Sequence, residues 1–336
     1  MRASARDRDG LSAGVIAEDT GQPLWSPGGD VQWRYARAVA FVVPPPLEPG
    51  DVIAVVAPSG PVPRDELWRG LAWLRGRYRI RMRTGALARR GYLAGDDARR
   101  RDELASAMLD HEVKAIVVAR GGYGVMRVVD SLPWDALVER PKWIAGFSDV
   151  TALHAFAWRA GVASVHAPNV TGLGRDASPG VRAAWLAALE RPTATRTWPA
   201  LRAIRGGEAR GPIVGGNLAL VHAMAAAGRL AIPEGSVLAL EDVTEAPYRI
   251  DRMLTSLAIG GYLSRVSAIL FGGFERCTTG ADGQTVDDVL YDCTHPLGIP
   301  VFAGAPFGHG ARNDAFVLGA EVQVQGDTAT WQPGRD

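Results

Sequence analysis

Lysine is nearly absent from this 336-residue chain. Lys114 and Lys142 are the only two, so 35 of the 37 basic residues are arginines. Neither lysine lies in a Gly-x-x-x-x-Gly-Lys-Ser/Thr sequence, which excludes a P-loop nucleotide site. Both precede apolar runs typical of buried strands, which argues against a Schiff-base lysine. The arginines are scattered along the chain, so we attribute their abundance to coding bias and not to a basic binding face.

Cysteine, net charge and long apolar runs are also scarce. Cys277 and Cys293 match no metal-ligand or redox spacing, so we expect free thiols in a reducing compartment. A formal net charge of +1 gives no electrostatic reason to expect nucleic acid or an anionic membrane as a partner. No apolar run approaches the roughly 20 residues that span a bilayer, and the apolar stretch at 38–43 is too short and too late for a signal peptide. We therefore expect a cytoplasmic protein.

The composition is that of a globular protein with one large or two medium domains, with 47% hydrophobic and 22% charged residues. Residues 1–43 differ from the rest, because they are rich in Gly, Asp, Arg and Ser and lack sustained periodicity. We predict a poorly ordered extension there. The remainder predicts two domains, 44–174 and 211–336, joined by a linker at 175–210 where periodicity is weak.

Short apolar runs alternate with segments of helical spacing, which indicates βαβ units and a mostly parallel sheet, hence the α/β class. The predicted strands lie at 52–56, 115–119, 143–145, 162–165, 237–240, 266–271 and 300–303. The predicted helices lie at 63–77, 96–110 (with Asp96 or Asp97 as N-cap), 216–227, 250–259 and 286–292. Alternating residues at 321–325 and 328–331 predict a closing hairpin.

Ser148 stands in the run Ala-Gly-Phe-Ser-Asp-Val-Thr, between a predicted strand and a helical segment. A strand, sharp turn and helix would place its hydroxyl at the carboxyl edge of a sheet. The next N–H and the helix dipole there favour a developing oxyanion. The run lacks the second glycine of Gly-x-Ser-x-Gly, and Ser-Asp-Val-Thr also suits a plain helix N-cap. Both interpretations stay open on this pattern.

A glycine-rich turn, Arg120-Gly121-Gly122-Tyr123-Gly124, follows the predicted strand 115–119. Glycines at the end of a strand let backbone N–H groups approach a ligand closely. The turn does not match Gly-x-Gly-x-x-Gly, and no acidic residue is placed as a dinucleotide site requires. The pattern fits either a tight connection or an N–H donor that faces the Ser148 turn.

A serine nucleophile needs a base and an acid that orients it. His166 ends a predicted strand and His309 lies between two glycines, and the pattern does not decide between them. The other histidines suit structural positions: His111, His154, His222 and His295. For the acid, Glu241 and Asp242 follow the predicted strand 237–240, with Glu245 and Asp251 close behind. A solvated charged loop explains these carboxylates equally well. No His-Glu-x-x-His, paired cysteine or histidine-rich cluster predicts a metal site.

Six blocks in order resemble the LD-carboxypeptidases, a serine peptidase family that includes muramoyltetrapeptide carboxypeptidase and the microcin C self-immunity peptidase. The resemblance extends from Pro44 to about Gly319, and residues 1–43 have no counterpart in it. The blocks are Pro-Gly-Asp-Val-Ile-Ala-Val-Val-Ala-Pro-Ser-Gly (49–60), Ala-Arg-Gly-Gly-Tyr-Gly (119–124), Gly-Phe-Ser-Asp-Val-Thr (146–151), Gly-Gly-Asn-Leu (215–218), Leu-Glu-Asp-Val-Thr-Glu-Ala-Pro-Tyr-Arg-Ile-Asp-Arg-Met-Leu (240–254) and Gly-His-Gly (308–310).

The resemblance implies the roles of the site residues. Ser148 is then the nucleophile, His309 the general base and Glu241 the acid that holds His309, while the N–H groups of Gly122 and Asp149 form the oxyanion hole. The implied fold has two lobes. A flavodoxin-like parallel sheet with helices carries the serine, a mixed α/β lobe supplies Glu and His, and the active site lies at their junction.

The implied reaction is hydrolysis of the amide between an L-centre and a terminal D-amino acid, as in D-Ala release from murein tetrapeptide during cell-wall recycling. It needs no cofactor and no metal, and its partner is a small muropeptide-like substrate, with no nucleic acid and no membrane. Such an enzyme must bind a free carboxylate, for which arginine is suited. Arg120 and Arg249 are the candidates. A homodimer is one assembly that the sequence leaves open.

Three alternatives remain on the sequence. An immunity-type peptidase would cleave peptidyl- or aminoacyl-nucleotide amides with the same triad and would need an aromatic residue to stack on a base, for which Trp185 and Trp198 are candidates. A non-catalytic protein could hold a peptide or sugar in a cleft between the lobes. A flavodoxin-like cofactor binder would require a phosphate loop, and none is evident.

Overall fold

A computed structural model describes residues 41–175 and 177–331, all of which belong to the unit Tyr35–Asp336. Most of the extension predicted at 1–43 lies outside these residues. Of its last three residues, Val42 forms an isolated parallel bridge with Val162.

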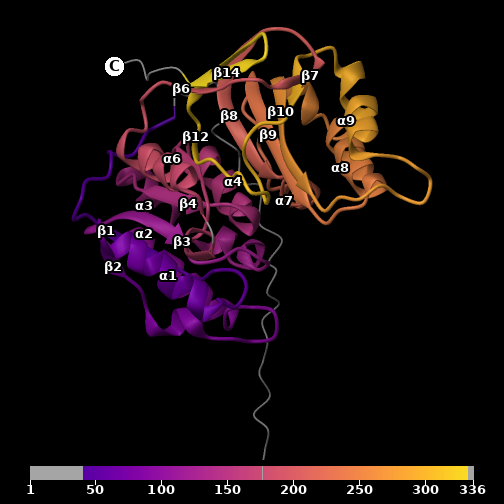
Figure 1. The fold of residues 1–336 in the computed structure, drawn as a ribbon. Coiled ribbons are helices and arrows are strands. Elements are labelled where there is room, and N and C mark those ends of the chain that lie inside the picture. The colour runs from indigo at the N-terminus through magenta and orange to yellow at the C-terminus, as the bar shows by residue number, and fades with distance from the viewer. Residues whose placement is uncertain (1–40, 176, 332–336) are drawn as a thin grey trace, which may run out of the picture. The chain divides into compact units, whose positions relative to one another are not determined.

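The first sheet has six strands in the order β12-β5-β4-β3-β1-β2 (Figure 1). Their bounds are β1 (Val52–Val56), β2 (Arg79–Arg81), β3 (Val113–Val118), β4 (Trp143–Gly146), β5 (Ser164–His166) and β12 (Phe316–Leu318). β1 to β5 are parallel, and the central strands β1, β3 and β4 are apolar and buried except at Lys114, because helices cover both faces of the sheet. The mostly parallel sheet that we expected is confirmed, and one strand at its edge is antiparallel. β12 comes from the C-terminal region and pairs antiparallel with β5, Phe316 opposite His166.

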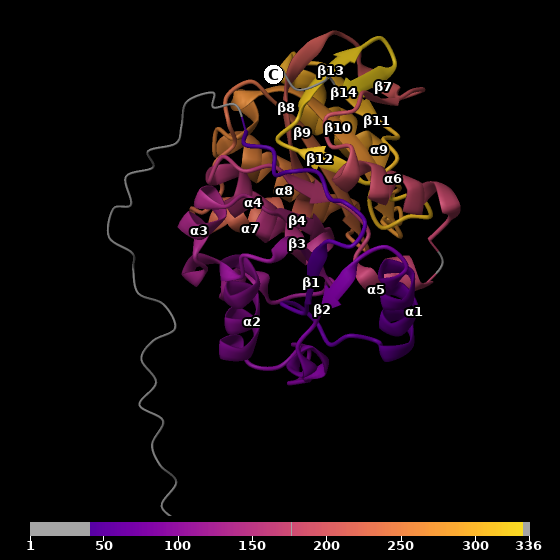
Figure 2. The same ribbon diagram turned by 90° about the vertical axis from the view of Figure 1, so that its left-hand side faces the viewer.

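Helices cover both faces of this sheet, and Figure 2 shows α2 and α1 on opposite sides of β1 and β2. One apolar core joins Ile53 and Val117 to Leu71 of α1, and a second core joins Val56 and Ile116 to Leu104 of α2. The helices are α1 (Arg64–Arg75), α5 (Val170–Arg175) and α6 (Pro179–Glu190) with the first core, and α2 (Asp97–Leu109), α3 (Trp134–Glu139) and α4 (Thr151–Arg159) with the second. α2 begins at the expected N-cap, since Asp96 accepts the Arg99 N–H.

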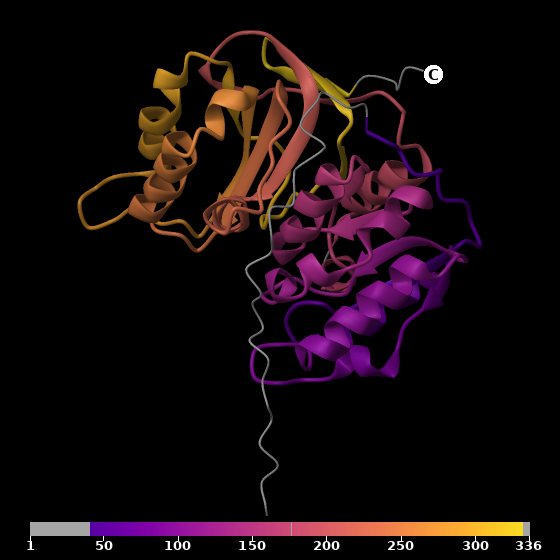
Figure 3. The same cartoon turned by 180° about the vertical axis from the view of Figure 1, so that it is seen from behind.

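The second sheet has eight strands in the order β6-β14-β13-β8-β9-β10-β11-β7. Their bounds are β6 (Arg196–Trp198), β7 (Arg202–Arg205), β8 (Ala209–Asn217), β9 (Ser236–Val243), β10 (Val266–Glu275), β11 (Val301–Ala303), β13 (Glu321–Gln325) and β14 (Thr328–Trp331). Its helices are α7 (Leu218–Ala226), α8 (Pro247–Ile259) and α9 (Val286–Thr294), which lie beside the long strands in Figure 3. The predicted hairpin is confirmed with the bounds that the alternation indicated.

The segment expected as a linker, 175–210, carries regular structure. α6 buries Val181, Trp185 and Leu189 on one face, and Trp185 and Leu189 belong to a core of the first sheet. β6 and β7 pair with β14 and β11 of the second sheet. The helical spacing was hidden by flanking Pro, Arg and Thr residues. Strand β8 was also missed, because Gly and Pro residues interrupt its apolar alternation.

The two sheets share one of these apolar cores. It contains Leu153 and Phe156 of α4 together with Val221 and Met224 of α7, which contacts α4. The loops that follow β4 and β9 are therefore fixed to one packed body. Within residues 41–175 and 177–331, no helix has both the length and the apolarity needed to cross a membrane.

Candidate active site

Ser148 lies on a strained turn. β4 ends at Gly146, a 3₁₀ turn covers Ser148–Val150, and α4 begins at Thr151. The φ angle of Ser148 is +68°, in the left-handed region that non-glycine residues seldom adopt. Such a conformation costs of order 1–3 kcal/mol and persists only where the surroundings hold it. The expected strand, sharp turn and helix are thus present, with the serine at the turn itself.

The glycine-rich turn packs directly against this serine. A Cβ on Gly121 would lie 2.9 Å from Ser148 Cβ and 3.0 Å from Ser148 Oγ, so only glycine fits there. Gly122 has φ +113° and is exposed. Within the described residues, the backbone N–H groups of Gly122 and Asp149 donate no hydrogen bond. Two free donors therefore stand on the two loops that meet at Ser148.

Asn169, which no sequence pattern indicated, holds the chain just before Ser148. Its Oδ1 accepts the Phe147 N–H at 3.3 Å. A Cβ on Gly146 would lie 2.8 Å from the same oxygen, so the missing side chain of Gly146 makes room for the amide. The sequence holds both residues, Gly146 at the end of β4 and Asn169 just past β5, but no local pattern indicates that they are in contact.

Glu241 and His309 form a hydrogen-bonded pair. His309 Nδ1 lies 2.7 Å from Glu241 Oε2. Because a carboxylate can only accept, Nδ1 carries the proton, and a neutral ring then leaves Nε2 free as a base. Glu241 is fully buried and the His309 side chain is 19% exposed. The rings of Phe147 and His309 lie 4.7 Å apart between centroids, which places His309 beside the Ser148 turn.

Glycine allows this pair to form. Gly308 has φ +121°, and a Cβ there would lie 3.0 Å from Glu241 Oε2. The pattern had predicted Glu241 just after the end of a strand, but Glu241 lies within β9, because β9 runs on to Val243. The position of Glu241 is thus set by regular sheet, whereas His309 stands on a glycine-flanked loop.

His166, the other candidate base, is fully buried at the end of β5. Its Nε2 lies 3.3 Å from Asn313 Oδ1, which also accepts the Gly308 N–H at 3.2 Å. Burial lowers the pKa of His166 well below its ordinary value of 6.5. His166 therefore supports the loop that carries His309. The neighbouring His154 is also buried, which lowers its pKa to about 4, and it contacts the Gly146 carbonyl oxygen at 2.9 Å.

A second buried carboxylate follows Glu241. Asp242 Oδ1 accepts from Asn217 Nδ2 and Asp242 Oδ2 accepts the Ala219 N–H, both at 2.9 Å. The Asn217 N–H in turn donates to Thr151 Oγ1 at 3.0 Å. Burial raises the pKa of Asp242 to about 6 against the opposing effect of these donors. A continuous chain of hydrogen bonds thus runs from Thr151 at the start of α4, through Asn217, to Asp242, the residue after Glu241.

The two arginines proposed for carboxylate binding lie in different surroundings. Arg120 is half-buried and its Nη1 donates to the Pro61 carbonyl oxygen at 2.5 Å, at the glycine-rich turn. Arg249, on α8, has a half-exposed side chain that lies 3.5 Å from Glu245 and 5.9 Å from the centroid of the Tyr248 ring. Neither contact assigns a substrate role.

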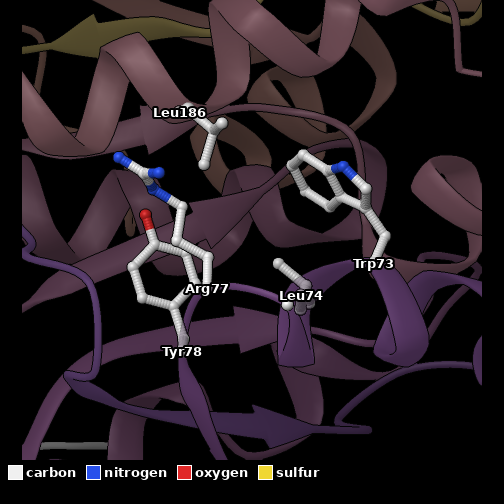
Figure 4. A pocket seen from close by; sticks show the side chains of 6 residues that line it. Trp73, Leu74, Arg77, Tyr78 and Leu186 are labelled. Atoms are coloured by element: carbon white, nitrogen blue, oxygen red, sulfur yellow. The ribbon is translucent and has the colours of Figure 1, made fainter.

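A cavity of about 300 Å³ lies away from these residues (Figure 4). It is lined by Trp73, Leu74, Gly76, Arg77, Tyr78 and Leu186. None of Ser148, Glu241 and His309 takes part in it, so the cavity does not define the site. In the part of the chain that the structure describes, no group of three or more His, Cys, Asp or Glu side chains could hold a metal ion. Cys277 and Cys293 are free, as predicted.

Comparison with known families accounts for both halves of this arrangement. The LD-carboxypeptidase N-terminal domain matches residues 53–167, and the C-terminal domain of the same family matches 210–324. This chain belongs to the LD-carboxypeptidase family. The first match contains Ser148 and Gly122, and the second contains Glu241 and His309.

Relatives of this LD-carboxypeptidase family member extend over most of its length. A candidate carboxypeptidase of Synechocystis sp. is 39% identical over 299 residues, which cover 86% of this chain and 96% of that protein. The murein tetrapeptide carboxypeptidase of Pseudomonas aeruginosa is 30% identical and covers 83% and 94%.

Solved structures share the two-lobed α/β fold. The muramoyltetrapeptide carboxypeptidase from Oxalobacter formigenes has a TM-score of 0.76 at 25% identity, over 84% of this chain and 98% of that one. The microcin C7 self-immunity protein, solved in complex with glutamyl sulfamoyl guanosine, has a TM-score of 0.79 at 19% identity and covers 87% and 98%. At that identity the likeness supports the fold alone.

Proposed function

We propose that this protein is a serine carboxypeptidase that hydrolyses the amide between an L-centre and a terminal D-amino acid, with D-Ala release from murein tetrapeptide as its reaction. One observation carries the proposal. The Glu241–His309 pair lies beside a serine held at positive φ, next to two free backbone donors. The family relatives named as murein peptidases support the choice of substrate.

The proposed chemistry follows from this arrangement. Ser148 Oγ attacks the amide carbonyl carbon while His309 Nε2 takes the hydroxyl proton. Glu241 stabilises the resulting imidazolium through Nδ1. The oxyanion is held by the N–H groups of Gly122 and Asp149, each worth about 3 kcal/mol of transition-state stabilisation in comparable enzymes. His309 then protonates the leaving amine, which departs as the D-amino acid, and water hydrolyses the acyl-enzyme.

The immunity-type reaction is the second candidate, since a structural neighbour binds a sulfamoyl nucleoside. The two tryptophans that the sequence offered for base stacking do not favour it, because Trp185 is fully buried and Trp198 is 6% exposed. Both pack inside apolar cores. A nucleobase would therefore need a different aromatic residue, and we propose the muropeptide reaction.

Recognition of the free carboxylate distinguishes a carboxypeptidase from an endopeptidase. Arg120, at the glycine-rich turn, and Arg249, on α8, are the proposed partners. A matched pair of tetrapeptides, one with a free C-terminus and one amidated, measures this preference. If either arginine binds the carboxylate, its substitution by glutamine reduces kcat/KM for the free acid and leaves the amide unchanged.

A digest of tetrapeptide muropeptides, with mass detection of released D-Ala, tests the proposed function. The wild type is expected to release D-Ala and Ser148→Ala to release none above background. Turnover of an aminoacyl sulfamoyl nucleoside in place of the muropeptide would transfer the proposal to the immunity-type reaction. No turnover of either compound would contradict the enzyme interpretation and favour a cleft that only binds. The cytoplasmic location and the homodimer stay predictions.

A further inference from the structure

The side chain of Asp149 is buried at a place that the proposed chemistry does not use. Asp149 directly follows Ser148 in the chain and is 0% exposed. Its Oδ2 accepts the N–H of Val125 at 2.9 Å. Val125 is the first residue after the glycine-rich turn, so this bond joins the nucleophile turn to the loop that carries Gly122. A carboxylate buried without a reacting role needs another explanation.

A third loop reaches the same carboxylate. Ser59, in the loop after β1, is fully buried, and its hydroxyl lies close enough to lower the pKa of Asp149. Burial outweighs this effect and that of the Val125 N–H, and raises the pKa to about 6. Within the described residues, Ser59 Oγ and Asp149 Oδ1 form no hydrogen bond of standard geometry. Ser59 thus brings the loop after β1 close to the same buried carboxylate.

Arg100 holds the same loops from the other side. It stands on α2, is 0% exposed, and its Nη1 donates to the carbonyl oxygens of Pro58 and Gly124, the latter at 2.7 Å. A Cβ on Gly124 would lie 2.4 Å from that Nη1, so the turn lies against the guanidinium. The Gly60 N–H also donates to the Gly121 carbonyl oxygen at 3.1 Å, which ties the β1 loop to the glycine-rich turn.

These contacts connect the ends of three neighbouring strands, β1, β3 and β4. The two proposed oxyanion donors stand on two of those loops, Gly122 after β3 and Asp149 after β4. Donors of this kind act only when they lie within a few tenths of an ångström of the position that the oxyanion takes. Each donor is on a loop of its own, so a link between the loops is required to fix their separation.

We propose that the Asp149 carboxylate is a positioning residue that fixes the Ser148 turn and the Gly122 loop at the separation that the oxyanion requires. Asp149, Ser59 and Arg100 are together called the buried clamp, because their side chains contact the loops that follow β1, β3 and β4. This inference rests on the proposed function. It assigns to the side chain a role distinct from that of the Asp149 backbone N–H.

The test compares Asp149→Asn with the wild type and with a control variant, Asp130→Asn. In the wild type, Asp130 is an exposed carboxylate in an ion pair with Arg229. A tetrapeptide ending in D-Ala gives kcat and KM. The rate at which a fluorophosphonate modifies Ser148, followed by intact mass, reports the oxyanion hole without depending on the natural substrate. For Asp149→Asn we expect kcat and the modification rate to fall together by about 100-fold, with KM changed less than about twofold. Asp130→Asn is expected to match the wild type.

Every outcome bears on the clamp. Wild-type rates in Asp149→Asn, or a rise in KM with unchanged kcat and modification rate, would overturn it. If Asp149→Asn does not fold by circular dichroism, Ser59→Ala carries the test. It is expected to lower both rates by roughly 3- to 10-fold, since it removes the buried hydroxyl that lies near the Asp149 carboxylate, and unchanged rates would overturn the proposal. If the wild type reacts at Ser148 but releases no D-Ala, only the proposed substrate fails. If it does neither, the catalytic serine fails as well, and the clamp with it.

Discussion

The two halves of the site are built by different means. On the nucleophile side, named for the proposed role of Ser148, this serine stands at positive φ on a turn, and glycines on the neighbouring loop leave room for it. On the acid–base side, named for the proposed roles of Glu241 and His309, Glu241 is an internal residue of β9, and only His309 depends on a glycine-flanked loop. Yet in both halves the residue after the proposed catalytic one is a buried aspartate that accepts backbone N–H groups, Asp149 and Asp242.

The positions of Glu241 and Ser148 are fixed by different kinds of contact. A carboxylate within a sheet is positioned by the backbone hydrogen bonds of the sheet. The Asp242 side chain is therefore free to accept hydrogen bonds from the end of β8 and the first turn of α7. A serine on a strained turn has no ladder to position it, so Asp149 joins neighbouring loops instead. Each of the following substitutions affects one side, both, or the link between them.

Glu241→Gln breaks the acid–base side and leaves the Ser148 turn untouched. An amide donating to Nδ1 would force the proton onto Nε2, and the ring would then be unable to act as a base. We expect kcat to fall by about 10⁴-fold, as in other triads that lose the acid. Steady-state hydrolysis of the tetrapeptide measures it. Glu234→Gln, at an exposed ion pair with Arg265, is the control and should retain wild-type kcat. A loss below tenfold in Glu241→Gln would argue against the assigned acid.

Gly121→Ala breaks the nucleophile side. The added Cβ would lie 2.9 Å from Ser148 Cβ, so the turn must shift. A displacement approaching 1 Å at the reacting group costs about 100-fold in rate. The fluorophosphonate modification rate measures the effect. Gly206→Ala, where no atom lies within 4 Å of the added carbon, should react like the wild type. Equal rates in the two variants would contradict the tight contact.

Asp149 and Asp242 are also alike in how their contributions to stability should depend on pH. Burial raises both pKa values to about 6, above 3.8 for an ordinary aspartate. The folded state therefore binds these protons more tightly than the unfolded chain. The stability from each group is complete below pH 4 and is lost as the pH rises through 6. The difference between 3.8 and about 6 in the pKa of each aspartate corresponds to about 3 kcal/mol.

Substitution of either aspartate by asparagine removes this dependence. From pH 4 to pH 7, the free energy of unfolding of each variant should improve relative to the wild type by up to about 3 kcal/mol. Urea denaturation at stepped pH measures it, with Asp130→Asn as a control whose curve should parallel the wild type. A constant difference across the pH range would mean that the carboxylate in question titrates normally.

Thr151→Val tests the link between the two sides. It removes the oxygen that accepts the Asn217 N–H at 3.0 Å and leaves that buried donor unpaired. We expect a loss of about 1–3 kcal/mol in the free energy of unfolding. Thr255→Val removes an exposed hydroxyl bonded to Asp251 and should change stability by less than about 0.5 kcal/mol. Equal effects from the two substitutions would show that the link adds no stability.

Local pattern predicted the nucleophile side better than the acid–base side. The strand, turn and helix around Ser148 and the glycine-rich turn are each encoded within a few residues, so spacing was sufficient to find them. The choice between His166 and His309 could not be made from pattern, because it depends on Glu241, which lies far away in sequence. The resemblance to a known family supplied that choice.

Residues that join segments distant in sequence were missed for the same reason. Asn169, Asn313 and the Thr151–Asn217 bond act through tertiary contacts that no periodicity encodes. Asp149 was singled out for its backbone N–H, while its side chain gave no signal. The membership of β12 in the first sheet also required the structure, since neighbouring strands in a sheet need not be neighbours in sequence.

The antiparallel pairing of β12 with β5 affects how the chain can fold during synthesis. When the ribosome has released residues 41–300, five strands of the first sheet are present, but β5 still has an open edge. That edge stays available for pairing with another chain until Phe316–Leu318 emerges. The first sheet is thus completed only when most of the second lobe has been translated, and a nascent chain arrested before that point keeps the β5 edge unpaired.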